Sequence, residues 1–297
     1  MSYEDKRTKL EESLEDIKNG STIAIGGFSL NNSPMALIRE LIRKELTDLT
    51  IIGALPLGLQ IDLLLGAGCV KKVICPAIGF EAFGIAPNFV RACKDDSVEL
   101  VPCDVGFTTY GLRAAAENLP FHPYPLNVLE NTDLIEKNKD IRKIFDPFHD
   151  TEVIAVPPLE PDFALIHTQS TDITGNCLHQ GSRAADDLLA EAAKSTIITT
   201  DEILPKEWLK QSEVSQTTIP KHFVSKIVHI PFPCHPLSSH NQYKVDEIHI
   251  KKYLKLSKTK KGFQEYQDNM ILAPKIKNNY AYLRASGGKD YLDKLRV

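Results

Sequence analysis

The sequence lacks several features that mark specialised classes of protein. None of its apolar runs approaches the roughly 18 residues that cross a bilayer, so we expect no membrane segment. Residues 1–20 are charged and have no apolar centre, so we expect no secretory signal there. A basic face is also missing, because the net charge is -4 and the one lysine-rich run, 251–261, fits a solvated helix face. This balance argues against nucleic acid as a partner.

Metal-binding and disulfide patterns are equally scarce. No two of the six cysteines form a Cys-x-x-Cys pair, and we interpret them as reduced, mostly packed thiols of a cytoplasmic protein. Cys103 has no supporting His and Asn arrangement and fits a core or cleft-wall thiol better than a nucleophile. His229, His235 and His240 lack helical i, i+4 spacing, so we expect no metal site. His167 closes an apolar run and fits a satisfied core histidine.

What the sequence does contain is an alternation of short apolar runs with helical segments. Hydrophobic residues make up 42% and charged residues 25%, as in ordinary globular proteins. The alternation predicts an α/β fold with an open, mostly parallel sheet and helices on both faces. The expected strands are 23–25, 49–54, 71–77, 98–103, 153–158, 163–168, 195–203 and 226–232.

We expect the 297 residues to form one domain, with a core at about 10–240 and a helical tail at 245–297. The proline-bearing segment 120–151 is predicted to be loops. A domain break within 121–150 is the alternative.

The most informative stretch is Asn19–Pro34. An apolar strand ends at Gly26-Gly27, and the candidate N-cap residues Asn31, Asn32 and Ser33 precede a helix predicted at 34–46. Function in parallel sheets lies at the carboxyl ends of strands. A strand, glycine turn and helix start would point free N–H groups at an anionic or carbonyl-bearing ligand. The plainer alternative is an ordinary turn between strand and helix.

This stretch resembles the N-terminal signature of family I coenzyme A transferases. The matching residues are Asn19, Gly20, Ile23, Ala24, Ile25, Gly26, Gly27, Phe28 and Pro34. Asn32 stands where the signature has glycine, and Asn is the side chain that best tolerates the left-handed conformation. A second block, 145–176, is similar to the alpha chain of glutaconate coenzyme A-transferase. The resemblance covers most of 10–240.

The resemblance implies a two-subunit enzyme in which this chain is the A (alpha) subunit. Coenzyme A would pass between an acyl-CoA thioester and a carboxylic acid through a glutamyl thioester on the B (beta) subunit. No catalytic residue is then expected in this chain, and the CoA thioester would be a substrate rather than a permanently bound cofactor. We expect a heterotetramer or larger assembly with the B subunit.

The resemblance and the strand ends together predict a substrate-binding set. Gly26, Gly27 and Phe28 would shape the pocket, with backbone amides as donors to the developing oxyanion. The remaining candidates, Asn32, Ser33, Phe80, Glu81 and Asp104, lie in the same turn or after neighbouring strands. A solvated carboxylate is the alternative for Glu81 and Asp104, and helix capping is the alternative for Ser33.

Two alternative functions stay open. The same family resemblance extends to two-subunit hydrolases of steroid degradation, which open a carbon ring in a CoA ester. A non-catalytic nucleotide-binding protein is the other alternative, although Gly-x-Gly-x-x-Gly does not follow the first strand. The acyl group and the acceptor acid cannot be read from these residues.

Overall fold

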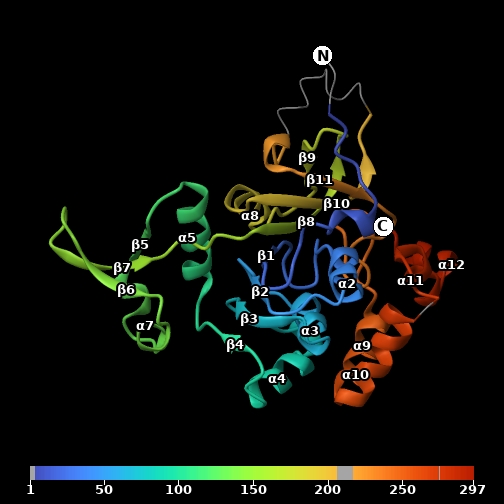
Figure 1. Ribbon diagram of the computed structural model, residues 1–297, viewed down its shortest axis with the longest axis horizontal. Helices are drawn as coiled ribbons and strands as arrows, with labels where there is room; N and C mark the ends of the chain where they lie inside the picture. The colour runs from blue at the N-terminus through green and yellow to red at the C-terminus, as the bar shows by residue number, and fades with distance from the viewer. Residues whose placement is uncertain (1–3, 206–216, 274) are drawn as a thin grey trace.

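A computed structural model describes residues 4–205, 217–273 and 275–297 of the chain, and Figure 1 shows its arrangement. The central sheet has the order β11-β10-β8-β1-β2-β3-β4, in which all neighbours are parallel, and β9 adds an antiparallel pair to β8. The predicted fold class is therefore confirmed. The strands are β1 (Thr22–Ile25), β2 (Leu49–Ile52), β3 (Val70–Ile74), β4 (Glu99–Leu100), β8 (Phe163–Thr171), β9 (Cys177–Leu178), β10 (Ser195–Ile203) and β11 (Lys226–His229).

Helices cover both faces of this sheet because its strands are apolar on both sides. In β1, Ile23 and Ile25 face one hydrophobic core, and Ala24 faces the other. The first core receives α1 (Leu10–Ser13), α2 (Met35–Arg43) and α3 (Leu59–Gly66), with α4 (Pro87–Lys94) beside α3. The second core receives α5 (Val105–Ala116) and α8 (Asp186–Ala192).

The C-terminal segment packs onto the first core. It forms α9 (Glu247–Ser257), α10 (Lys260–Gln267), a π-helical turn at Asp268–Leu272, α11 (Asn279–Ala285) and α12 (Lys289–Leu292). The side chains of Tyr253, Phe263 and Tyr282 are buried in the same cluster as those of α2 and α3. The segment predicted as a helical tail is thus helical and is a packed layer, which we call the C-terminal layer.

The prediction of loops at 120–151 is wrong. This region forms most of a second sheet, with antiparallel order β5-β7-β6, which projects from the body in Figure 1. Pro123 and Pro125 are tolerated because β5 is an edge strand. The strand predicted at 153–158 belongs to this sheet rather than to the central one. The elements here are β5 (His122–Pro125), α6 (Leu126–Leu129), α7 (Leu134–Lys137), β6 (Arg142–Asp146) and β7 (Thr151–Val156).

The loops after β1, β2 and β3 are joined edge to edge at the carboxyl side of the central sheet. Isolated bridges link Ser29 to Leu57 and Leu57 to Ile78. The Gly26-Gly27 turn therefore lies on a continuous rim rather than on an independent loop. Across the described part of the chain, the helices are too short or too polar to traverse a lipid bilayer.

Candidate functional site

The turn after β1, which we call the bend (residues 26–33), packs tightly against its own chain. Gly27 has φ +87°, and a Cβ there would contact Ser33 Oγ and lie 2.6 Å from the Asn31 carbonyl oxygen. A Cβ on Gly26 would lie 2.6 Å from Asp186 Oδ1. Both glycines are thus required by contacts within the chain.

The bend does not offer the free amides that the sequence predicted. Gly26 N–H donates to the Leu165 carbonyl at 2.8 Å, and Phe28 N–H donates to the Asn31 carbonyl at 3.0 Å. Gly27 N–H donates to Asp186 Oδ1 at 2.8 Å. Because each donor is already engaged, an oxyanion hole built from these three amides is not available in this conformation.

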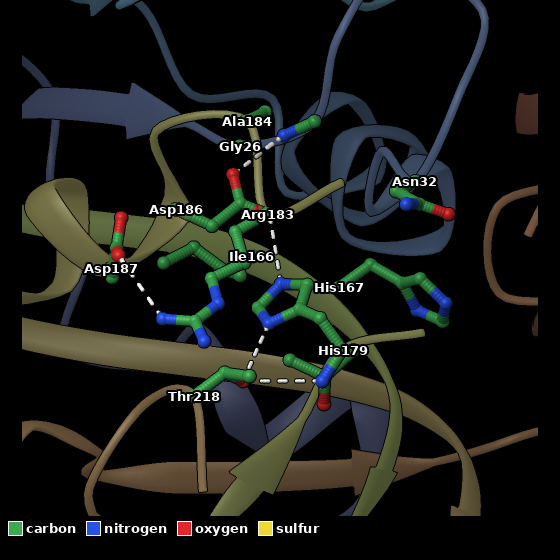
Figure 2. A network of polar contacts seen from close by, with 12 residues as sticks. Gly26, Asn32, Ile166, His167, His179, Arg183, Ala184, Asp186, Asp187 and Thr218 are labelled. Atoms are coloured by element: carbon green, nitrogen blue, oxygen red, sulfur yellow. Dashed lines mark hydrogen bonds and ion pairs between the residues drawn. The ribbon is translucent and has the colours of Figure 1, made fainter. Parts of the chain in front are cut away.

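A chain of buried side chains supports the bend from α8. The second oxygen of Asp186 accepts a hydrogen bond from His179 Nε2 at 3.1 Å, and His179 Nδ1 lies 2.7 Å from Thr218 Oγ1 (Figure 2). The side chains of His179 and Asp186 are 0% and 1% exposed. Neither residue was predicted from the sequence, because both lie far from the bend along the chain and Asp186 looks like an ordinary first-turn acid.

Asn32 anchors the other end of the bend. Its φ is +53°, so it does supply the left-handed conformation expected of it. Its Oδ1 also accepts hydrogen bonds from Gln169 Nε2 at 2.9 Å and from His240 N–H at 3.0 Å. A glycine at this position could adopt the conformation but could not make these two contacts, so the asparagine ties the bend to β8.

Ser33 holds the bend together rather than capping a helix. The N-cap of α2 is Pro34 and has no side-chain cap, so the capping prediction is wrong. Ser33 Oγ donates to the Gly26 carbonyl at 3.1 Å and accepts from Gln60 Nε2. Gln60 Nε2 also donates to the Ser29 carbonyl at 3.0 Å, so α3 also holds the bend in position.

The exposed side chains of the rim include one within the bend and one after β3. Phe28 is 43% exposed, although it lies next to two buried glycines. Glu81 is exposed and begins a short 3-10 turn, Glu81–Phe83, with φ +51°. These two side chains can meet a ligand from solvent.

Two candidates from the sequence have structural roles instead. Phe80 is fully buried and its ring centroid lies 5.9 Å from that of Tyr253. Asp104 caps α5 by accepting from Phe107 N–H at 2.8 Å, and its other oxygen accepts from Tyr124 Oη at 2.6 Å. Burial, together with that bond to Asp104, raises the pKa of Tyr124 and keeps it a donor. We therefore leave Phe80 and Asp104 out of the site.

His167 is a satisfied core histidine, as predicted. Its ring is fully buried, with Nδ1 3.2 Å from Thr199 Oγ1 and Nε2 3.0 Å from Ser239 Oγ. Ser239 Oγ itself donates to Asp201 Oδ2 at 2.6 Å. Serine, histidine and aspartate meet here, but the hydroxyl is buried and bonded to the carboxylate, which does not fit an activated nucleophile.

The cysteines of the rim are poor nucleophiles. Burial raises the pKa of Cys75 to about 11 and that of Cys103 to about 12. Both thiols stay protonated near neutral pH, which agrees with the prediction of packed, unreactive side chains.

The possible metal ligands gather where the C-terminal layer begins rather than at the rim. Among the described residues, His235, Asp246 and His249 place one ligand atom each within 4.8 Å of one another. Their atoms are already hydrogen bonded: His235 Nε2 to Asp246 at 3.0 Å, and His249 Nε2 to Tyr266 at 2.9 Å. The guanidinium of Arg39 lies nearby, 3.6 Å above the Tyr282 ring. We interpret this group as a hydrogen-bonded core network.

The chain is similar to known proteins in both sequence and structure. The sequence profile described as coenzyme A transferase matches residues 7–229. The alpha chain of glutaconate CoA-transferase from Acidaminococcus fermentans is 29% identical, over 91% of this chain and 88% of the relative. The crystal structure of that enzyme has a TM-score of 0.92 at 27% identity, covering 98% of this chain and 96% of that one.

Other relatives carry different names. The IpdA subunit of a cholesterol ring-cleaving hydrolase from Rhodococcus jostii is 30% identical, over 90% of this chain and 92% of the relative. An uncharacterized protein from Archaeoglobus fulgidus is 34% identical over 98% of this chain. This chain spans 64% of the length of that archaeal relative.

Proposed function

Because this chain belongs to the coenzyme A transferase family, we propose that it is the alpha chain of a two-subunit CoA transferase. The observation that carries this proposal is the bend, whose glycine-rich string is built into the carboxyl rim of a parallel sheet, where ligands of such folds bind. The likeness to a glutaconate CoA-transferase structure along nearly the whole chain supports it.

The proposed reaction proceeds through two exchanges at one carboxylate. On the B subunit, a glutamate attacks the acyl-CoA thioester carbonyl, forming a mixed anhydride and releasing the CoA thiolate. The thiolate then attacks the glutamyl carbonyl, which gives a glutamyl-CoA thioester and frees the first acid. A second acid reverses these steps and leaves as the new acyl-CoA. No step needs an oxidant or a reductant, and each acyl or CoA group that is released in one step is bound again in a later one.

In this proposal the alpha chain supplies a rigid wall to the acyl pocket. Gly26, Gly27, Asn32 and Ser33 form its framework, and Phe28 and Glu81 are the side chains that reach the ligand. The internal hydrogen bonds of the bend support this division, because they fix its shape before any ligand binds. Such preorganisation lowers the entropic cost of holding the acyl group beside a nucleophile.

The assembly and setting belong to the proposal as well. Relatives carry subunit names, and one structural neighbour is a decarboxylase composed of AibA and AibB, which supports a B-type partner here. We propose a heterotetramer or larger complex in the cytoplasm, where all six cysteines would stay reduced. The acid substrates are left as a class: carboxylic acids and their CoA thioesters.

A ring-cleaving hydrolase is the second candidate. The specific observation in its favour is that the Rhodococcus relative is as similar to this chain as the glutaconate CoA-transferase relative is. Its reaction would need water and a cyclic CoA ester but no acceptor acid.

The test is to purify the chain alone and together with a B-type subunit encoded beside it. We expect CoA transfer between a thioester and an added acid from the complex only. Transfer by the isolated alpha chain would contradict the proposal. Product that forms in water without any acceptor acid would favour the hydrolase.

A further inference from the structure

One buried carboxylate from outside the bend contacts its two glycines. Asp186 touches the bend at both glycines, through the bond to Gly27 N–H and through the close approach to Gly26. We propose that Asp186 is a positioning residue for the acyl pocket, and that His179 orients it. This inference rests on the proposed function only where it concerns catalysis.

The carboxylate of Asp186 fits the space that Gly26 leaves. Its Oδ1 lies 2.8 Å from Gly27 N and 2.6 Å from where a Cβ of Gly26 would stand. The missing side chain of Gly26 thus allows the close approach of a side chain of the same protein. The missing side chain of Gly27 instead leaves room for Ser33 and the Asn31 carbonyl of the bend itself.

Because the carboxylate of Asp186 is buried, its orientation is fixed by the partners of its two oxygens. A carboxylate with 1% exposure is stable only when both oxygens have partners. Gly27 N–H donates to one oxygen of Asp186. His179 Nε2 donates to the other, and Thr218 Oγ1 lies 2.7 Å from His179 Nδ1 (Figure 2). The imidazole therefore sets the direction in which Asp186 points.

The neighbouring acid on the same helix has a different environment. Asp187 is adjacent to Asp186, but its side chain is 39% exposed and lies 3.9 Å from the exposed Arg183 (Figure 2). It makes no described contact with the bend. Asp187→Asn is therefore a matched control that changes the same charge on the same turn.

The first measurement is steady-state kinetics of the complex with its B subunit. We expect Asp186→Ala to lower kcat about 30- to 100-fold, because a displacement of about an ångström costs roughly that much, with KM for acyl-CoA changed less than about threefold. Asp186→Asn keeps an oxygen acceptor for Gly27 and should lose less than about tenfold. Asp187→Asn should match the wild type.

A second measurement does not depend on activity. Amide hydrogen exchange should show Gly27 N–H at least about tenfold less protected in Asp186→Ala, while Gly26 N–H, bonded to Leu165, keeps its protection. If the wild-type complex transfers no CoA, the proposed function fails, and this exchange experiment alone decides whether Asp186 holds the bend.

The outcomes against the inference are equally definite. Unchanged kcat in Asp186→Ala, unchanged protection of Gly27, or an equal loss in Asp187→Asn would each overturn it. If Asp186→Ala does not assemble, Asp186→Glu replaces it, since the longer side chain would push into the bend. Full turnover by an intact Asp186→Glu complex would then refute the positioning role.

Discussion

Two buried histidine–aspartate pairs can be compared, one behind the bend and one at the start of the C-terminal layer. His179 lies 3.1 Å from Asp186, and His235 lies 3.0 Å from Asp246. In both pairs the side chains are 0% and 1% exposed. Judged by distance and burial alone, the two pairs are interchangeable.

What separates the pairs is the group that binds the second carboxylate oxygen. In the first pair that oxygen accepts from Gly27, at the rim of the sheet. In the second pair it accepts from His249 N–H at 2.9 Å and from Tyr291 Oη at 2.8 Å, so Asp246 caps α9 and ties it to α12. The same pair therefore serves a site in one place and helix packing in the other.

The largest effect should come from breaking the second pair. We expect Asp246→Ala to lower the free energy of unfolding by about 3–5 kcal/mol, because it strands a buried imidazole and removes a helix cap. Urea unfolding measures this loss. The matched control is Glu247→Ala, on the adjacent exposed residue paired with Lys251, which should cost less than about 1 kcal/mol. Similar losses in both variants would contradict the assignment.

Breaking the contact between Gly26 and Asp186 should instead lower kcat. We expect Gly26→Ala to reduce kcat of the complex about 100-fold, because its methyl group would collide with Asp186 Oδ1. The double variant Gly26→Ala with Asp186→Ala relieves the collision and should be no slower than Asp186→Ala alone. Losses that multiply would show that the two residues do not share a contact.

Acid should weaken the C-terminal layer. Burial is the main reason that the pKa of His249 falls from 6.5 to about 3, and the nearby His235 and Arg39 add to it. The folded state thus binds fewer protons than the unfolded state, so stability present above pH 6.5 is lost as the pH falls towards 3. This group alone should remove about 2 kcal/mol between pH 7 and pH 5.

Urea unfolding at pH 7 and pH 5 measures the pH dependence, to which the buried His235 also contributes because burial lowers its pKa as well. Comparison with a variant at position 249 separates the part that His249 contributes. His249→Asn should reduce the pH dependence even though it lowers stability at both values. Equal pH dependence in the wild type and His249→Asn would exclude His249 as its source. Asp246 contributes only at lower pH: burial opposes its ionisation, but its hydrogen bonds lower its pKa to about 2.

The smallest effect should follow from Asn32→Gly. Glycine adopts the φ of +53° without strain, so only the contacts to Gln169 and His240 are lost. We expect kcat of the complex to fall less than about tenfold, since Asp186 still holds the other end of the bend. A fall in kcat as large as that expected for Gly26→Ala would mean that the contacts of Asn32 to Gln169 and His240, rather than Asp186, hold the bend in position.

Periodicity and turn chemistry predicted the main sheet well. The strand expected at 195–203 has the same limits as β10, whose centre, 196–200, is β-branched and buried between β8 and β11. The second sheet was missed because β5 carries two prolines and β6, with the sequence RKIFD, is mostly polar. Both are edge strands, which need no apolar pattern.

The sequence predicted where the bend lies but not which residues hold it. The glycine string locates the bend, and Asn32 indicates a left-handed residue. The partner of Gly27 is 159 residues away, and no local pattern distinguishes Asp186 from the partly exposed Asp187 beside it. Only the tertiary fold, which brings the start of α8 against the bend, makes one of them a contact of Gly27.

The most direct test is to trap the covalent intermediate in the assembled complex. Incubation with acyl-CoA followed by hydroxylamine or borohydride, and then peptide mass spectrometry of both chains, identifies the modified residue. We expect modification of one glutamate on the B subunit, with none on this chain. A modified carboxylate on this chain, at Glu81 for example, would contradict the proposed division of roles.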